Sequence, residues 1–431
     1  MIRNVPEDPL PARDPYAAFR VPNFFRYILG NILIQIGMGA QGLAIGWDIY
    51  KRTGQPLALG LVGGVQAIPM ILLSLPAGYL ADKFDRRRII TICLLGVALC
   101  SLGLSWLSHI NGSIQIMYLL LLLDATFMTL QRPAGASIFP SLVPPETFEN
   151  AMKWNSSMSQ ISAVGGPALG AAIIVWSIPA AYVTNAVFAV VFISLLLSLS
   201  LKPSPAAAGT MSLSNVLAGV RFVWSRKVLL ASISLDLFAV LLGGATYLLP
   251  VFAQDILHVG AHGLGWLRAA PAVGAFIMAI LLAHLPPLRH AGRTLLFAVA
   301  GFGVATIIFG ISKNFWLSWV MLLLTGALDN VSVVVRHTLI QLLTPDEMRG
   351  RVSAVNAIFI GSSNEIGGLE SGVVAQALTP VASVIIGGIG TIAVVTIWAL
   401  TFPRLRRFGR LTVTPEELAA DEENVSPIPV S

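Results

Sequence analysis

Several acidic residues lie inside stretches that are otherwise apolar, and four of them are Asp124, Asp329, Glu365 and Glu370. A carboxylate buried in a membrane-like environment either takes up a proton or pairs with a cation on another helix. Proton uptake of this kind can couple a proton gradient to the movement of another solute. The sequence therefore predicts these four residues as proton-coupling candidates. Asp329 and Glu365 lie nearest the middle of their stretches, and Glu370 lies closer to an end.

Three arginines, Arg132, Arg268 and Arg336, also lie inside apolar stretches. Arg336 is seven residues from Asp329 and shares its helical face, but two helical turns separate them and exclude a direct pair. Glu365 has two open roles, as a proton carrier or as the structural partner of an arginine such as Arg268. Arg132 and Arg336 lie toward the ends of their stretches, where snorkelling or ordinary contacts between helices are alternatives to a functional role.

The elements that must position these charges are transmembrane helices. Hydrophobic residues make up 55% of the 431 residues and charged residues only 11%, which excludes an ordinary soluble fold. Apolar runs of about 20 residues, long enough to cross the hydrocarbon core, recur along the chain. They predict an all-α membrane protein with about twelve spans, near residues 24–48, 57–81, 88–108, 114–138, 152–176, 178–201, 228–253, 262–284, 293–311, 315–341, 352–377 and 380–402.

Basic residues are distributed unevenly between alternate loops. The side that holds both termini collects most of the Lys and Arg residues, whereas the other side holds only Lys51, Arg52 and Lys313. The positive-inside rule then predicts a multi-pass protein of the inner (plasma) membrane with both termini in the cytoplasm. The N-terminal segment also lacks the apolar core and cleavage site of a secretory signal. The net charge of +6 comes from basic residues along the inner face of the membrane, where anionic lipids attract them. Nucleic-acid binding is therefore not needed to explain the charge and is not expected.

The chain divides into two halves around a break in the apolar pattern after residue 201. We expect a cytoplasmic N-terminal tail (1–23), a six-helix bundle (24–201), a cytoplasmic linker with an amphipathic helix (202–227), a second six-helix bundle (228–402) and a cytoplasmic C-terminal tail (403–431). The amphipathic helix either lies along the inner interface or packs under the bundle. Pro144 and Asn155 recur at the same spacing as Pro345 and Asn356, as internal repeats predict.

The spans also differ regularly in charge. Apart from an arginine at the first position of two of them, spans three, six, nine and twelve contain no Asp, Glu, Lys or Arg. Because a charge that faces lipid is costly, we expect these four spans at the periphery. The first span of each triplet is then expected to line a central cavity.

A dense charge cluster follows the second span and comprises Asp82, Arg86, Arg87 and Arg88, with Gly78 one turn before it. The stretch from Gly78 to Arg88 resembles the signature between helices 2 and 3 of the major facilitator superfamily. This resemblance implies that Asp82 and its arginines form a conformational latch across the domain interface. The alternative is plain positive-inside charge. Asp85 stands where the superfamily usually has glycine, and the equivalent loop of the second half has no acidic residue.

Gly166, Pro167 and Gly170 in the fifth span resemble the central part of the superfamily's antiporter motif. Its glycines permit close helix packing and its proline bends the helix. The resemblance favours export, and ordinary packing of small residues is the alternative.

Longer matches resemble the enterobactin-exporter-like branch of the superfamily, which includes macrolide-efflux-like proteins. They include Trp47-Asp48-Ile49-Tyr50 and the run from Asp329 through Arg349-Gly350-Arg351 to Glu370. The resemblance covers nearly the whole chain and implies two pseudo-symmetric six-helix bundles. It implies a proton-coupled exporter of a small organic molecule, such as a siderophore or drug, that works by alternating access. An uncoupled facilitator or an importer is the alternative.

Other classes have little support in the sequence. We find no nucleotide-binding loop, nucleophile elbow or metal-ligand spacing, so we expect neither an enzyme nor a bound cofactor or metal; a membrane-embedded enzyme or a lipid-handling protein is the least favoured alternative. Cys93 and Cys100 lie seven residues apart on one predicted helix, about 10 Å along its axis, which excludes a disulfide between them. The expected partners are the small-molecule substrate, protons and membrane lipids, and the expected state is a monomer.

Overall fold

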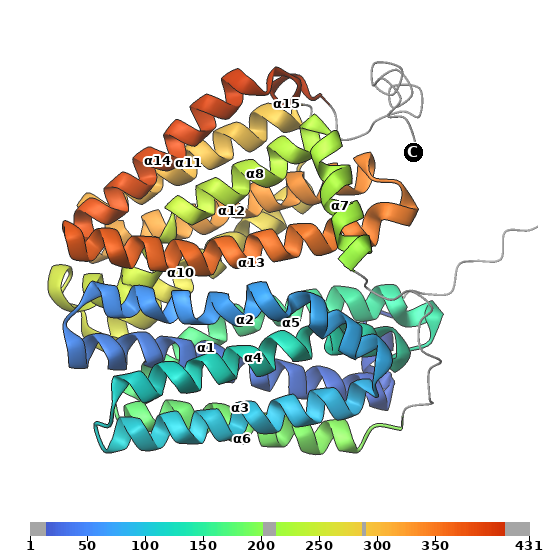
Figure 1. The fold of residues 1–431 in the computed structure, drawn as a ribbon, viewed down its shortest axis with the longest axis vertical. Helices are drawn as coiled ribbons and strands as arrows, with labels where there is room; N and C mark the ends of the chain where they lie inside the picture. Colours follow the sequence, from blue (N-terminus) through green and yellow to red (C-terminus); the bar gives the residue numbers. More distant parts are fainter. Residues whose placement is uncertain (1–13, 201–212, 287–289, 410–431) are drawn as a thin grey trace, which may run out of the picture.

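The computed structural model describes residues 14–200, 213–286 and 290–409, and these are almost entirely helical (Figure 1). The first half contains η1 (Ala17–Arg20), α1 (Pro22–Thr53), α2 (Pro56–Lys83), α3 (Arg86–His109), α4 (Ile114–Ile138), η2 (Phe139–Leu142), η3 (Pro145–Thr147), α5 (Phe148–Ile174) and α6 (Ile178–Leu197). After α7 (Leu213–Ser225), the second half contains α8 (Lys227–Leu242), η4 (Gly244–Leu248), α9 (Leu249–Val251), η5 (Phe252–Ile256), α10 (Gly260–His284), α11 (Ala291–Ile311), α12 (Phe315–Leu343), α13 (Asp346–Ala377), α14 (Pro380–Thr401) and α15 (Pro403–Arg407).

Eleven helical segments within the described residues are long and apolar enough to cross a membrane. The twelfth expected span corresponds to α13, whose 32 residues give a length of about 48 Å. This helix includes Glu365, Glu370, Arg349 and Arg351, which lower its apolar character. It packs along α2 of the other half, so protein covers one of its faces (Figure 1). The fold is therefore the predicted all-α membrane fold, with one span that is unusually polar.

The helices form two groups, one from each half (Figure 1). The groups meet where α2 packs on α13 and α5 packs on α10. The spans poor in charge are α3, α6, α11 and α14, and they lie at the outer edges of the two groups, as their composition predicts (Figure 1). We call the end at which α1 starts and α14 ends the terminal end, and the other the opposite end.

Several helices begin at residues that satisfy free backbone N–H groups. Asp85 caps α3, because its carboxylate accepts hydrogen bonds from the backbone N–H groups of Arg87 (2.8 Å) and Arg88 (3.3 Å). Thr379 caps α14 through the N–H of Ala382 (3.1 Å). Asp85, unusual at its position in the motif, therefore gives the turn a helix cap in place of glycine's flexibility.

The expected seventh span is apolar along its whole length, but it does not form one regular helix. The α-helix α8 ends at Leu242, and the chain continues through the 3₁₀ turn η4, the short α9 and the π-helical η5. At the break, a Cβ on Gly244 would lie 2.5 Å from the backbone oxygen of Gly367 in α13. Only glycine allows that approach. The break turns Thr246 and Tyr247 toward α10 and α13, where they contact charged residues.

The two halves touch closely toward the opposite end. A Cβ on Gly60 of α2 would lie 2.8 Å from the Cα of Gly372 in α13. Beside this contact, the hydroxyl of Tyr50 at the end of α1 donates a hydrogen bond to Asp255 in η5. These contacts join the halves at the opposite end.

The linker helix α7 packs under the second half. Val223 is buried against Leu229, Ile340 and Val352, while Trp224 is exposed. Residue 201, the first part of the predicted linker (202–212) and most of both tails lie outside the described residues, so the predicted N-terminal tail is seen only from residue 14.

Candidate functional site

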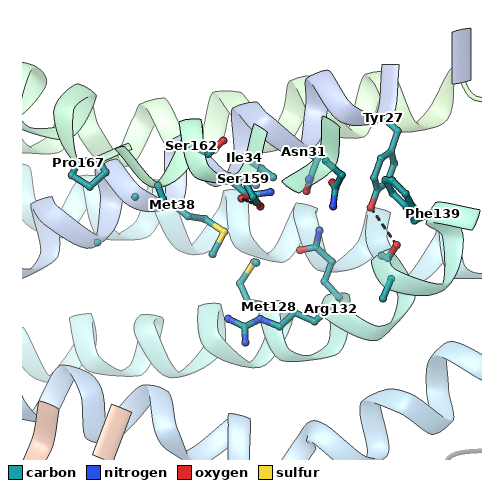
Figure 2. Close-up of a pocket in the computed structure, with 18 of the residues that line it drawn as sticks. Tyr27, Asn31, Ile34, Met38, Met128, Arg132, Phe139, Ser159, Ser162 and Pro167 are labelled. Atoms are coloured by element: carbon teal, nitrogen blue, oxygen red, sulfur yellow. Dashed lines mark hydrogen bonds between the residues drawn. The ribbon is translucent and has the colours of Figure 1, made fainter. Parts of the chain in front are cut away.

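A cavity of about 790 Å³ lies mainly within the first half and reaches α10 of the second (Figure 2). Its walls are the first two-thirds of α1, the second half of α4 and the first part of α5, closed at depth by Arg268 of α10. All three wall segments lie on the terminal-end side of their helices. Together with the contacts at the opposite end, they place the cavity on the terminal-end side of the closed region. Spans one and four (α1 and α4) line this cavity, as expected for the first span of a triplet. Spans seven and ten contribute none of its lining residues in the described part of the chain, whereas α5 and α10 do.

Polar side chains and methionines line this cavity. Its four side-chain amides and two arginines are Asn31, Gln35, Gln131, Asn155, Arg132 and Arg268. Met38 and Met128 approach each other across it, from α1 and α4 (Figure 2). Ser159 donates a hydrogen bond to Gln35 (3.1 Å), and Tyr27 donates one to the backbone oxygen of Gly135 (3.3 Å; Figure 2). None of the lining residues is acidic.

The break in span seven brings together Arg268, Tyr247 and Glu365. Arg268 donates a hydrogen bond to the backbone oxygen of Thr246 (2.8 Å), and Tyr247 donates one to the Glu365 carboxylate (2.5 Å). Both Arg268 and Arg132 interact electrostatically with Glu365. No cation lies within 4 Å of this carboxylate among the described residues. Its direct partner is the Tyr247 hydroxyl, so Glu365 is not the ion-pair partner of Arg268.

A second pocket, of about 400 Å³, lies within the second half and is lined by Asp236, Asp329, Arg336 and His337. Arg336 forms an ion pair with Asp236 of α8, and its side chain is almost completely buried. Snorkelling of Arg336 is therefore wrong, because its partner lies inside the bundle. Asp329 is partly buried beside this pair and has no ion pair within 4 Å in the described part of the chain. Of the two acidic residues that line this pocket, Asp236 has a direct cation partner and Asp329 has none within the described residues.

Asp124 is also buried, in the first half. Beside it, Gln41 accepts hydrogen bonds from Ser101 (2.8 Å) and Asn185 (3.0 Å), and Gln41 also interacts with Asp124. One carboxylate oxygen of Asp124 has no hydrogen-bond partner. Asp124 thus belongs to a polar cluster between α1, α3, α4 and α6, away from the residues that line the large cavity.

Glu370 lies nearer the opposite end and is partly buried, with a 3.4 Å contact to the hydroxyl of its neighbour Ser371. It shares no pocket with Glu365 or Asp329 among those described above. The structure therefore does not gather the four acidic candidates into one site.

The basic cluster after α2 makes contacts within its own half. Arg86 donates to the backbone oxygen of Ser137 at the end of α4 (3.0 Å). Arg87 donates to the backbone oxygens of Leu197 and Leu199 at the end of α6. Such contacts satisfy free carbonyl groups at helix C-termini. Gly78 is buried, Asp82 is partly buried and Arg88 is exposed.

Gly166, Pro167 and Gly170 lie where α5 crosses α1. A Cβ on Gly166 would lie 2.9 Å from the Cα of Gly39, and one on Gly170 would lie 2.8 Å from the Cα of Ala40. Pro167 also lines the large cavity. The motif therefore sets a close helix crossing directly beside the cavity.

Sequence reasoning missed Tyr247 and Gln131. Tyr247 was unremarkable in an apolar run, although the neighbouring Gly243-Gly244 is a signal for a break. Gln131 is a buried amide beside Arg132, and its side-chain oxygen has no hydrogen-bond partner. An amide within an apolar span is the signal that could have identified it.

Two groups of transmembrane helices, with a polar cavity that reaches from the first group to α10 of the second, define a membrane transporter of the major facilitator type. Solved structures support this fold: a mutant form of the nucleoside transporter NupG superposes with a TM-score of 0.73 at 11% identity, over 88% of this chain and all of NupG. A bacterial homologue of the human lysosomal transporter Spinster, in an inward-facing and occupied conformation, gives 0.70 at 14% identity, over 94% of this chain and all of that one.

Sequence comparison narrows the class. The profile of the transmembrane secretion effector family matches residues 13–425, and the chain belongs to this family of major facilitator transporters. The enterobactin exporter EntS of Citrobacter koseri is 27% identical over 402 residues, 92% of this chain and 95% of EntS. EntS of Escherichia coli strain SMS-3-5 is 27% identical over 408 residues, 93% of this chain and 96% of EntS. The resemblance to the enterobactin-exporter-like branch is thereby confirmed.

Proposed function

We propose that this transporter exports a small organic molecule, such as a siderophore or drug, from the cytoplasm in exchange for protons. The observation that carries the proposal is the polar cavity of about 790 Å³, which lies on the terminal-end side of the contacts that join the two halves. A solute bound there is accessible from one side only. The relatives whose names describe enterobactin export support the outward direction.

The proposed orientation places the terminal end in the cytoplasm and the protein in the inner membrane. The excess of Lys and Arg at that end supports it. The structure then corresponds to the state that receives cargo from the cytoplasm. Export requires the two halves to rock so that the cavity closes toward the cytoplasm and opens outside. We propose that the protein works as a monomer in contact with lipids and binds no nucleic acid.

Proton coupling is proposed through Asp329 or Glu365. Coupling through these residues would fail if permanent ion pairs held both carboxylates, but neither has a cation within 4 Å among the described residues. Asp329 is favoured because it lines a pocket of its own, beside a pair that already balances the Asp236 charge. Asp124 and Glu370 remain secondary candidates. An uncoupled facilitator or importer is the competing function.

The latch is proposed to act in the opposite state. Arg86 and Arg87 here bind helix ends of their own half, which supports a structural role while the cytoplasmic side is open. Closing that side would bring the end of α2, with Gly78 and Asp82, and the first turn of α3, with Arg88, closer to the second half. The close crossing at Gly166, Pro167 and Gly170 supports a rigid α1–α5 pair that moves as one unit.

The test is to measure intravesicle pH in inverted vesicles with a proton gradient while adding iron-free siderophores and macrolides. Asp329→Asn and Glu365→Gln should each be compared with wild type, and Glu149→Gln, an exposed carboxylate at the terminal end, is the matched control. Proton efflux that depends on substrate and is lost in one of the two variants supports antiport. Substrate movement without proton flux in any variant would leave the facilitator.

A further inference from the structure

We propose that the large cavity recognises its cargo as an organic anion that also carries hydroxyl or amide groups. This inference rests on the proposed function, because it names the chemical class of the exported molecule. It comes from the charge of the lining, which includes Arg132 and Arg268 but no Asp or Glu.

Arg132 is available for an anion. Its side chain lines the cavity and runs along α4 beside Met128 (Figure 2). Within the described residues its guanidinium makes no hydrogen bond and no ion pair within 4 Å. A guanidinium offers five N–H donors in a planar fork that matches a carboxylate. An anion in the cavity would supply the partner that this side chain lacks.

Arg268 provides the second cation at the deep end of the cavity. One of its nitrogens donates to the backbone oxygen of Thr246, which fixes the guanidinium and leaves further donors. Glu365 balances only part of this charge, because one carboxylate acts on two arginines and its direct partner is Tyr247. The cavity therefore keeps an excess of positive charge.

The rest of the lining indicates what else the cargo carries. The amide side chains of Asn31, Gln35, Gln131 and Asn155 line the cavity, and an amide both donates and accepts hydrogen bonds, so they suit hydroxyl or amide groups on the ligand. Met38, Met128 and Met152 offer adaptable apolar contacts, suited to a ring or short chain. The acidic side chains Asp236 and Asp329 line the separate pocket of the second half. A cationic drug would find no carboxylate among the residues that line the large cavity.

Binding of matched probes to the purified full-length protein tests the proposal. Salicylate and salicylamide have the same hydroxylated ring but differ in charge, and each would be titrated while the melting temperature is recorded. We expect salicylate to bind about tenfold more tightly than salicylamide. Arg132→Gln should weaken salicylate binding about tenfold, and Arg132→Lys should recover part of it. Arg20→Gln, which removes an exposed charge outside the cavity, should leave binding unchanged.

Several outcomes would overturn the proposal. They are equal or tighter binding of salicylamide, no binding of salicylate, or salicylate binding that Arg132→Gln does not affect. Dioctanoyl-phosphatidylglycerol, titrated in parallel, identifies a lipid headgroup as the source of the anion if it binds more tightly than salicylate and loses affinity in Arg132→Gln. That result would also reject a small organic cargo. This assay measures binding without transport, so it tests anion recognition separately from export. Salicylate binding that depends on Arg132 can be found even if the vesicles show no proton-coupled export, and proton-coupled export can be found even if salicylate does not bind.

Discussion

The contact between Gly60 and Gly372 predicts how the transporter divides its time between two states. In Gly60→Ala, the new Cβ would lie 2.8 Å from the Cα of Gly372 and 3.1 Å from the backbone oxygens of Gly368 and Leu369. All three are backbone atoms, which cannot move away as the end of a flexible side chain can. Overpacking of this kind costs about 1–3 kcal/mol. The cost falls only on the state in which the halves touch at the opposite end.

The population ratio should therefore shift about 5- to 150-fold toward the state that is open at the opposite end. The higher helix propensity of alanine does not change this ratio, because α2 is expected to be helical in both states. The matched control is Gly42→Ala, since a Cβ on Gly42 of α1 meets nothing within 4 Å.

Distances between two spin labels at the opposite end would measure the ratio. Lys51→Cys and His262→Cys place one label on each half, at exposed positions. The native Cys93 and Cys100 are buried and should react slowly with the label. Gly60→Ala should move the distance distribution toward longer values, while Gly42→Ala should leave it as in wild type. An unchanged distribution in Gly60→Ala, or an equal change in both variants, would refute the reasoning.

Three further perturbations follow from the contacts. Arg52→Gln leaves the buried Asp48 carboxylate without the guanidinium that holds it at 2.7 Å and should cost about 3–5 kcal/mol, seen as a lower melting temperature in detergent; an unchanged melting temperature contradicts this. Tyr50→Phe removes the hydrogen bond that Tyr50 donates to Asp255 between the halves, which costs about 0.5–1.5 kcal/mol or more. A cysteine placed on the terminal-end side of this contact should then react faster with a label added from the opposite end. Equal labelling rates would contradict a role of this hydrogen bond in closing the opposite end. Gly274→Ala places a Cβ 1.9 Å from a backbone oxygen of α12 and should lower the yield of folded protein in size-exclusion chromatography.

The spans were predictable because apolar runs of membrane length are a strong signal. The ends were less so: the first span was expected to end at residue 48, but α1 continues to Thr53. The expectation stopped at the charges Lys51 and Arg52, whereas Arg52 pairs with Asp48 one turn earlier and both stay inside the helix. Counting apolar residues cannot detect charges that neutralise each other.

Residue types predicted which side chains are unusual but not what they contact. The sequence identified Arg336 and Glu365 as intramembrane charges, yet their partners, Asp236 and Tyr247, lie on other elements. The Tyr247 contact also depends on the break in span seven, where apolar residues continue through a change of helix type. Partners that are distant in the chain are decided by packing, which one sequence does not encode in its local pattern.

The pair formed by Asp48 and Arg52 has a consequence for how the protein is inserted into the membrane. The loop after α1 must cross the bilayer if the terminal end stays in the cytoplasm, and Arg52 would normally oppose that step. Its counter-ion lies four residues earlier on the same helical face, so the two can pair as soon as the helix forms. The first hairpin would then be translocated with this charge already neutralised. Only afterwards would the guanidinium reach the backbone oxygens of Leu107, Ser108 and Gly112, joining the early hairpin to helices synthesised later.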